Sequence, residues 1–173
     1  MESKSASASR SVLVHWAGVT DINSAGFVHG GTVLKLADEA AALAAMRHSA
    51  RRVVTGGLDR VAFLVPIEQG ELITLSASVN AVWRTSMEVG VRVTAERPGQ
   101  DAGSRHTNSA YFTMVALDDD GRPTPVPPLR CAGDEERRRE REAQVRRSYR
   151  LAEREELLGG RSSSALSRKF GGS

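Results

Sequence analysis

The pair Gly30-Gly31 follows His29 where a loop enters a long apolar segment. Unpaired N–H groups at a helix N-terminus, at the positive end of the dipole, favour a partial negative charge. Glycine there lets a ligand approach the backbone closely. A thioester carbonyl placed against those amides would be polarised, and its tetrahedral oxyanion stabilised. Paired glycines are also common in ordinary loop-to-helix turns, so that alternative stays open.

Asp38 lies within the same segment, among alanine and leucine neighbours. An unpaired carboxylate on an apolar helix face costs free energy, so such a group usually has a partner or a catalytic task. The catalytic task would be that of a general base. The structural alternative is a salt bridge to Lys35 or Arg47. Glu39 faces a different direction and is the less suitable acid.

Asn23 lies in the loop before the segment, where asparagine most often makes a turn. Its carboxamide is also able to hold a water molecule or a thioester carbonyl. Asp38 lies about 10 Å beyond Gly31 along one helix, which is more than a base, a water and a carbonyl in line would span. We therefore expect Asp38 of one subunit to face the glycine end of another, with two sites at a two-fold interface.

The hydrophobic periodicity of the sequence predicts the helix and strands that position these residues. Residues 30–49 predict a helix that is apolar almost all round, which is typical of a helix inside a protein. Alternation and β-branched residues predict five strands, at 11–19, 52–63, 72–83, 86–97 and 105–117. One buried helix with an antiparallel sheet wrapped around it is an α+β domain. That domain spans residues 11–130.

The flanking segments differ from the domain in composition. Residues 1–10 are rich in Ser and Ala, and residues 159–173 return to Gly and Ser, so both are predicted to be disordered tails. Residues 131–158 predict a charged helix. Its acidic and basic residues recur at spacings of three and four, as in the pairs Glu135–Arg139 and Glu142–Arg146.

A thin apolar stripe runs along this charged helix, and we expect it to pack on a neighbouring subunit. It is formed by Val145, Tyr149, Ala152 and Leu157. Standing free in solvent is the alternative for this helix.

Charge and cysteine content restrict the partners. The net charge is +3, and the basic surplus lies in the two ends while residues 11–130 are near neutral. A nucleic-acid-binding face needs basic residues clustered on folded surface, so no nucleic-acid partner is expected. The single Cys131 rules out an internal disulfide. Without a secretory leader or a membrane-length apolar run, we expect a cytoplasmic protein with no membrane insertion.

Several separated segments together resemble the cytosolic acyl-CoA hydrolase family, which includes bacterial short-chain acyl-CoA thioesterases and the tandem-domain brain acyl-CoA hydrolases. The resemblance covers roughly residues 12–130 and is specific as a multi-part pattern. The segments are Asp21-x-Asn-x-x-Gly-x-x-His-Gly-Gly, Lys35-Leu-Ala-Asp-Glu-Ala, Arg47-His48, Val54-Thr55, Phe63-x-x-Pro66 with Gly70, Thr85-Ser86-x-Glu88-Val, Ala110-Tyr-Phe-Thr-x-Val-Ala-Leu-Asp118 and Gly121-Arg122-Pro123.

The resemblance implies a hot-dog fold, with a five-stranded antiparallel sheet around one long central helix, and hydrolysis of fatty acyl-CoA to a fatty acid and coenzyme A. The family's catalytic aspartate matches Asp38, which acts as a base or attacks directly, and its asparagine matches Asn23. The two meet across a dimer interface, and trimers of dimers are common in the family. The resemblance implies no separate cofactor and no metal.

Coenzyme A binding requires cations and hydroxyls for its phosphates. By the resemblance, the turn at Thr85-Ser86 lies along the coenzyme groove, and we assign Arg84, Thr85 and Ser86 to it, with Thr55 and His29 as further substrate-binding residues. Arg84 is equally explained as a solvated hairpin charge. The Gly56-Gly57 pair departs from the family, where larger strand residues are expected, and predicts a looser strand or a wider groove.

Two other functions remain open from the sequence. Another hot-dog enzyme, a hydratase or dehydratase on an acyl thioester, needs a histidine paired with a carboxylate or asparagine in a different arrangement. A non-catalytic acyl-CoA-binding module, as in hot-dog regulators, needs a DNA-binding segment, and neither tail has the pattern of one. A thiol-release assay discriminates among the three.

Overall fold

The central element of the computed structural model is α1 (Gly30–Ser49), with the bounds that its composition predicts. The structure describes residues 1–100 and 103–170, and side chains in the same ranges as far as Leu158. Ala50 ends the helix in the left-handed region, at φ 53°, and its N–H donates to Met46 O.

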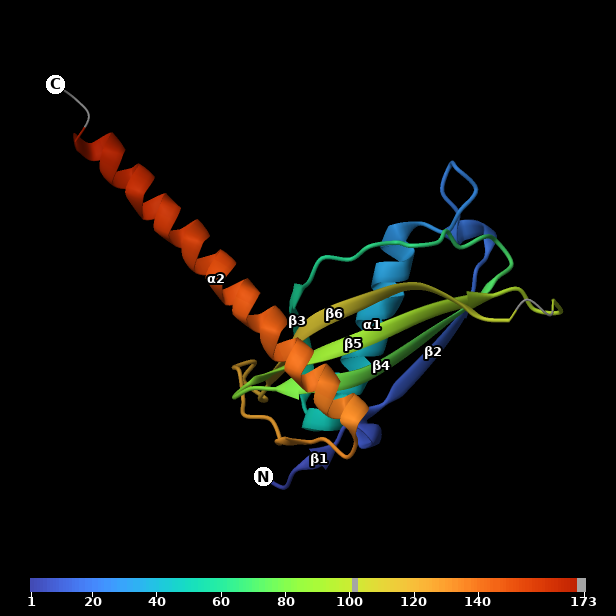
Figure 1. The fold of residues 1–173 in the computed structure, drawn as a ribbon, viewed down its shortest axis with the longest axis horizontal. Coiled ribbons are helices and arrows are strands. Elements are labelled where there is room, and N and C mark those ends of the chain that lie inside the picture. The colour runs from blue at the N-terminus through green and yellow to red at the C-terminus, as the bar shows by residue number, and fades with distance from the viewer. Residues whose placement is uncertain (101–102, 171–173) are drawn as a thin grey trace.

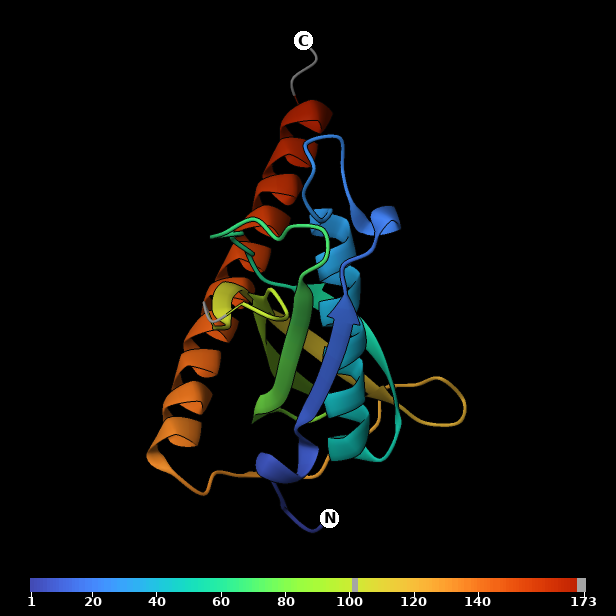
Figure 2. The same cartoon turned by 90° about the vertical axis from the view of Figure 1, so that its right-hand side faces the viewer.

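Five strands form an antiparallel sheet that curls around α1 (Figure 1 and Figure 2). They are β2 (Ser11–Trp16), β3 (Arg52–Leu58), β4 (Leu72–Val82), β5 (Ser86–Glu96) and β6 (Arg105–Leu117). Their order across the sheet is β2-β4-β5-β6-β3, which leaves β2 and β3 as edge strands. The predicted α+β class is confirmed.

Two of the predicted strands end earlier than expected. The strand at 11–19 ends at Trp16 because the chain turns at Gly18 into the short 3-10 helix η2 (Val19–Asp21). The strand at 52–63 ends at Leu58, and the chain continues beside β6 with only isolated backbone hydrogen bonds, from Asp59 to Tyr111 and from Leu64 to Thr107. Both shortened ends lead into the loops that flank the N-terminus of α1.

The core lies between α1 and the inner face of the sheet. The alternation in β5 is confirmed, since its predicted apolar face is fully buried and consists of Met87, Val89, Val91 and Val93. The helix contributes a face of alanines, namely Ala37, Ala40, Ala41, Ala44 and Ala45. Small side chains let the sheet approach the helix closely, so the position of α1 on the sheet is well defined.

Strand β3 carries an irregularity at its glycine pair. The register against β6 shifts between Thr55 and Gly57, which is a β-bulge. A Cβ at Gly56 would lie 3.1 Å from Val115, whereas one at Gly57 would meet open space. The predicted loosening of this strand therefore takes the form of a local break in the ladder, next to Thr55.

The N-terminal segment 1–10, for which a disordered tail is expected, carries secondary structure and contacts the domain. Strand β1 (Lys4–Ser5) pairs in parallel with β7 (Leu129–Arg130), and the 3-10 helix η1 (Ser7–Ser9) follows. The Ser9 hydroxyl lies 2.9 Å from Nδ1 of the buried His48. These partners are distant in sequence, so composition alone does not predict them.

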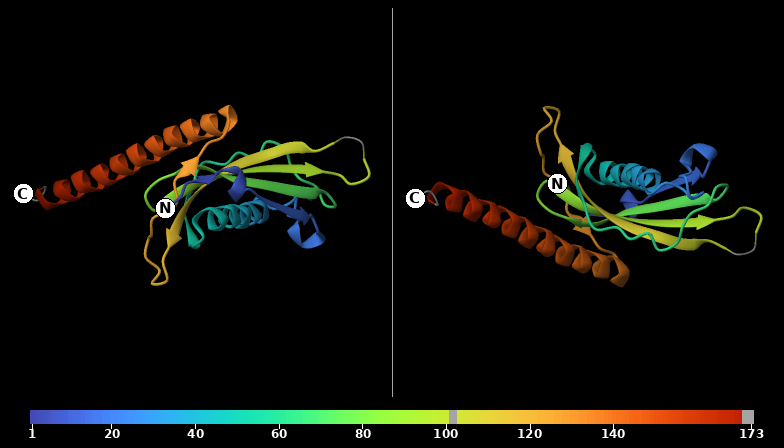
Figure 3. Two further views of the ribbon diagram at one scale, coloured as in Figure 1. Left: turned by 90° about the horizontal axis from the view of Figure 1, so that it is seen from below. Right: turned by 90° about the horizontal axis from the view of Figure 1, so that it is seen from above.

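The C-terminal helix α2 (Asp134–Phe170) lies across the outer face of the sheet, opposite α1 (Figure 3). The helix was expected to end at Leu158 and a disordered tail to follow over 159–173. The structure continues the helix to Phe170, and residues 171–173 lie outside the described residues. Of the described helices, none is long and apolar enough to cross a membrane.

Helix α2 has an exposed apolar side and a side that packs on the sheet of its own chain. Its apolar stripe is exposed, with Val145 53%, Tyr149 72% and Leu157 63% accessible, and the helix packs on its own sheet through Ala143 and several arginines. Packing of the exposed stripe on a neighbouring subunit stays a prediction. The pair Glu135–Arg139 forms, at 3.6 Å. Glu142 pairs with Arg138 rather than with Arg146, which reaches Glu88 on β5.

Candidate active site

Asp38 lies in the middle of α1 and is half-buried. Its Oδ1 accepts a 2.5 Å hydrogen bond from the hydroxyl of Thr55. Neither of the cations suggested as salt-bridge partners reaches it. Lys35 lies 3.8 Å from Glu39, and Arg47 donates to the carbonyl of Arg10. A neutral hydroxyl therefore orients the carboxylate, which keeps its charge available for chemistry.

The position of Thr55 adds a contact to its predicted substrate-binding role. We expected it along the substrate groove, and the structure places its hydroxyl against Asp38, with Met114 Sδ 3.6 Å away. It lies on the exposed edge strand β3, opposite Met114 and next to the bulge at Gly56. The contact of Thr55 with Asp38 was missed because it depends on the register of β3 over the helix.

The N-terminus of α1 is open. His29 is the N-cap residue and its side chain makes no capping hydrogen bond, so the first amides of the helix are free of a side-chain partner. A Cβ at Gly31 would meet nothing within 4 Å, whereas one at Gly30 would lie 3.2 Å from the ring of Phe63. Phe63, which lies after β3, therefore covers one side of the helix end and leaves the Gly31 side open.

Asn23 makes a turn and also keeps a free donor. Its Oδ1 accepts the N–H groups of Ala25 at 2.9 Å and Phe27 at 3.2 Å, while its own N–H donates to Phe27 O. These bonds fix the carboxamide in one orientation. Its Nδ2 has no hydrogen bond to any residue that the structure describes. Asn23 can therefore shape the turn through Oδ1 and still donate to a water or a thioester carbonyl through Nδ2.

A hydrogen-bonded pair of side chains that was not predicted from the sequence stabilises the loop before α1. Nε2 of His15 on β2 lies 2.8 Å from Oδ2 of Asp21, and the same oxygen accepts the N–H of Gly18. The hydrogen bond from His15 lowers the pKa of the Asp21 carboxyl below its usual value. The carbonyl of Asp21 accepts the His29 N–H at 2.8 Å, which closes the loop at the start of α1.

The turn at residues 83–86 joins β4 to β5 at the other end of the sheet. Ser86 pairs with Val115 of β6, while Thr55 pairs with the adjacent Met114 from the other side. Ser86 and Thr55 are thus about 10 Å apart, at two strand spacings. Arg84 is exposed, and no carboxylate of the described residues pairs with it. This leaves one unpaired cation beside Thr85.

The predicted site residues form two groups within one chain. In the first group, Asp38 and Thr55 are in contact, and residues 84–86 lie on the other side of β6 from Thr55. The other group surrounds the start of α1 and consists of Asn23, His29, Gly30 and Gly31. Seven residues of helix separate Gly31 from Asp38, which is about 10 Å. No group of three His, Cys, Asp or Glu side chains in the described ranges is placed to hold a metal ion.

A curled five-stranded sheet around one central helix, with polar groups at the N-terminus and in the middle of that helix, defines a hot-dog domain. Residues 25–102 match the model of the thioesterase superfamily. The chain is 41% identical to the VdlD protein of Helicobacter pylori over 76% of this chain and 74% of that protein. The chain belongs to the thioesterase superfamily.

The relatives whose names state an activity include the cytosolic acyl coenzyme A thioester hydrolase of Rattus norvegicus, which is 36% identical over 89% of this chain. The chain spans 41% of the length of that protein. The acyl-CoA hydrolase of Staphylococcus aureus, solved with butyryl coenzyme A and coenzyme A, is 33% identical. It has a TM-score of 0.85 and covers 94% of this chain and 98% of its own. The predicted hot-dog fold is confirmed.

Other solved relatives bear on the site and on assembly. Structures of the Staphylococcus aureus hydrolase have also been solved with alanine in place of one asparagine, one aspartate or one threonine. An acyl-CoA thioesterase with a TM-score of 0.84 and 35% identity, covering 88% of this chain and 97% of its own, is described as hexameric.

Proposed function

We propose that this chain is an acyl-CoA thioester hydrolase, with Asp38 as its catalytic carboxylate. The contact that carries this proposal is the hydrogen bond from Thr55 to Oδ1 of Asp38. It orients the carboxylate on an apolar helix without neutralising it, and leaves Oδ2 free to take a proton from water or to attack the thioester directly.

A spacing in the chain supports the choice of residues. Asn23 precedes Asp38 by fifteen positions, and Asp38 precedes Thr55 by seventeen. The asparagine, aspartate and threonine replaced in the Staphylococcus aureus hydrolase are separated by the same two intervals. We infer that the three residues correspond, and that Thr55 belongs to the catalytic group rather than to the coenzyme groove alone.

Asn23 and the start of α1 act on the thioester carbonyl in this proposal. The free Nδ2 of Asn23 and the uncapped amides at Gly30 and Gly31 are donors, and donors aimed at the carbonyl oxygen stabilise the oxyanion. Water adds to the carbonyl carbon, the carbon–sulfur bond breaks, and the proton taken by Asp38 leaves with the coenzyme A thiolate. Free fatty acid and coenzyme A are the products.

The two groups of residues belong to one site only if two chains combine. Asp38 of one protomer faces Asn23 and the glycine amides of its partner, because the two groups are about 10 Å apart along a single helix. The edge strand β3 offers unpaired backbone groups for a dimer. A trimer of such dimers is supported by the relatives described as hexameric.

Arg84, Thr85, Ser86 and His29 bind the coenzyme A part of the substrate in this proposal, with Arg84 as the unpaired cation for a phosphate. No separate cofactor is required. A location in the cytosol stays a prediction, supported by the cytosolic names of the mammalian relatives.

The proposal is tested by thiol release from a series of acyl-CoA chain lengths, with hydration of an enoyl-CoA measured in parallel. We expect thiol release that is lost in Asp38→Ala protein of unchanged oligomeric state. Full turnover in a folded Asp38→Ala variant would contradict the assignment of the carboxylate. Hydration without thiol release would identify the alternative enzyme class, and tight acyl-CoA binding without either reaction would identify a binding module.

A further inference from the structure

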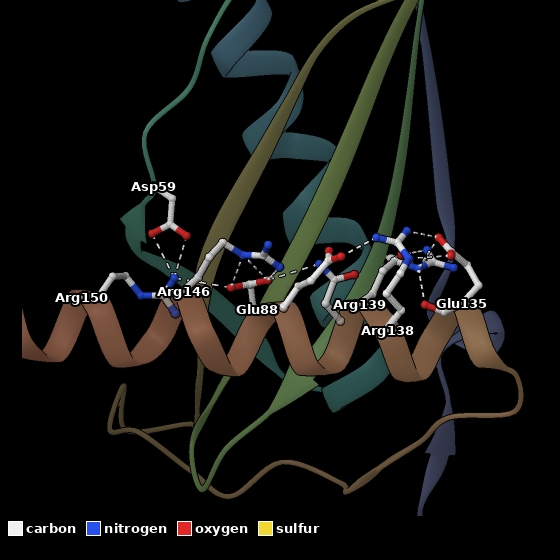
Figure 4. A network of polar contacts seen from close by, with 10 residues as sticks. Asp59, Glu88, Glu135, Arg138, Arg139, Arg146 and Arg150 are labelled. Atoms are coloured by element: carbon white, nitrogen blue, oxygen red, sulfur yellow. Dashed lines mark hydrogen bonds and ion pairs between the residues drawn. The ribbon is translucent and has the colours of Figure 1, made fainter.

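A buried acid on the outer face of the sheet holds α2 in place. The side chain of Glu88 on β5 is fully inaccessible to solvent, although it points away from the α1 core. A buried carboxylate needs partners, because its desolvation is costly. Two arginines of α2 supply them. Arg146 donates to both oxygens at 2.6–3.2 Å, and Arg150 Nη1 lies 3.4 Å away (Figure 4).

The sheet itself also supplies a partner for this acid. A β-bulge in β4 between Val79 and Ala81 inserts Asn80, whose Nδ2 donates to Glu88 at 3.2 Å. A Cβ at Gly90 would lie 2.6 Å from that Nδ2, so only glycine leaves Asn80 room to reach the acid. The guanidinium of Arg146 also lies 3.7 Å over the ring of Tyr111. The docking position of α2 is therefore fixed by directional contacts.

Arg150 extends this contact to the end of β3. Its Nη1 lies 2.7 and 2.9 Å from the two oxygens of Asp59, the first residue after that strand (Figure 4). The N–H of Asp59 donates to the Tyr111 carbonyl at 3.0 Å. The residue that follows the edge strand is thus held from two sides, by β6 in the sheet and by α2 on its outer face.

Thr55 lies four residues before this anchored point. Between the two are Gly56 and Gly57, with the bulge that interrupts the ladder to β6. An edge strand with a bulge and two glycines is locally adaptable, so the position of the Thr55 hydroxyl depends on what holds the strand's far end. Backbone pairing with β6 holds that end within the sheet, and the ion pair between Asp59 and Arg150 ties it to α2.

We propose that Asp59 and Arg150 are positioning residues for hydrolysis: by anchoring the end of β3 to α2, they keep the Thr55 hydroxyl on Asp38. The proposal rests on the proposed function, because Asp38 must be the reacting carboxylate. In this proposal Asp59 and Arg150 act only through Thr55, and this dependence is what an experiment can measure.

The test is a double-mutant cycle between Asp59→Asn and Thr55→Val, with kcat, KM and active-site concentration measured for each protein. We expect Asp59→Asn to lower kcat about tenfold with KM unchanged, since displacement of a catalytic contact reduces turnover steeply. In the Thr55→Val background the same substitution is expected to change kcat less than twofold. A merely structural role would give equal losses in both backgrounds, and that result would overturn the proposal.

Two controls separate the possible causes. Arg138→Ala removes exposed ion pairs to Glu135 and Glu142 on the same helix, which touch nothing on β3, and is expected to leave kcat unchanged (Figure 4). Trp83 reports whether α2 is docked, because Arg147 lies 4.3 Å over its ring and its Nε1 donates to Gln144.

Fluorescence of Trp83, measured with Trp16→Phe as the background for every protein in the cycle, should be the same in Asp59→Asn as in its parent, because Glu88 still holds Arg146. Wild-type kcat in Asp59→Asn together with an inactive Asp38→Ala would refute the positioning role alone. Full turnover in Asp38→Ala would instead remove the proposed function.

Discussion

The Thr55 hydroxyl donates to Oδ1 of Asp38 across a gap of seventeen residues, joining an exposed edge strand to the middle of the central helix. No cation takes part in the contact. The carboxylate is thus oriented on one oxygen and open on the other, which is the arrangement that a base or nucleophile requires. The consequences of this contact can be measured directly.

Thr55→Val is expected to lower kcat by about 10- to 100-fold, since a hydrogen bond to a charged group contributes about 1.5–3 kcal/mol. Thr55→Ser keeps the hydroxyl and should retain most of the turnover. Steady-state thiol release with both variants checks this. Equal activity of the Val and Ser variants would show that the hydroxyl is not needed.

The proposed site between two chains predicts complementation between inactive variants. Asp38→Ala and Asn23→Ala proteins should each be inactive, while an equal mixture after subunit exchange should regain up to about a quarter of wild-type turnover. Half of the dimers are then hybrids, and each hybrid has one intact site. Exchange is verified with differently tagged chains. No recovery despite proven exchange would place the whole site within single chains.

Gly31→Ala is expected to raise KM, or to lower kcat/KM, with little change in thermal stability. The added Cβ meets no protein atom within 4 Å and would occupy the space in front of the helix amides. Gly30→Ala is the matched comparison, because its Cβ would press on the Phe63 ring at 3.2 Å and should lower Tm. An unchanged kcat/KM in Gly31→Ala would argue against substrate at this helix end.

The burial of His48 predicts that the stability of the protein depends on pH. Its Nε2 lies 2.9 Å from the carbonyl of Pro127, which only accepts, so Nε2 carries the proton and Nδ1 accepts from the Ser9 hydroxyl. Burial lowers the pKa of this imidazole below its ordinary value. The unfolded chain therefore binds the proton more readily than the folded chain.

The stabilisation by neutral His48 is therefore complete above the unfolded pKa of about 6.5 and is lost as pH falls through the lower folded value. Urea unfolding between pH 8 and pH 5 measures this loss. His48→Gln should flatten the dependence, whereas His106→Gln, at a partly buried histidine, should not. An identical pH dependence in the His48 variant would contradict the prediction.

Local patterns predicted the elements well and their distant partners poorly. The bounds of α1 and the buried face of β5 follow from spacing within each segment, and the structure confirms both. The contact of Thr55 with Asp38 depends on the sheet register, and no local pattern contains that information. The same holds for β1, whose partner β7 is more than a hundred residues away in the sequence.

The charged helix shows why a correct element can have wrong contacts. Spacing of four predicts Arg146 beside Glu142, yet Arg146 binds Glu88. An exposed helical pair contributes only about 0.2–0.5 kcal/mol, whereas leaving a buried carboxylate without a partner costs far more. The ion pair with the buried Glu88 on the sheet is therefore the stronger interaction of Arg146, and helix periodicity carries no information about it.

The buried Glu88 makes α2 hard to dispense with. A chain cut before Asp134 would open Glu88 to water and remove both arginines that bind it. Asp59 would lose Arg150 as well, so the end of β3 would no longer be tied to a helix. A natural homologue that has no such helix is free to carry a different residue at the position of Glu88.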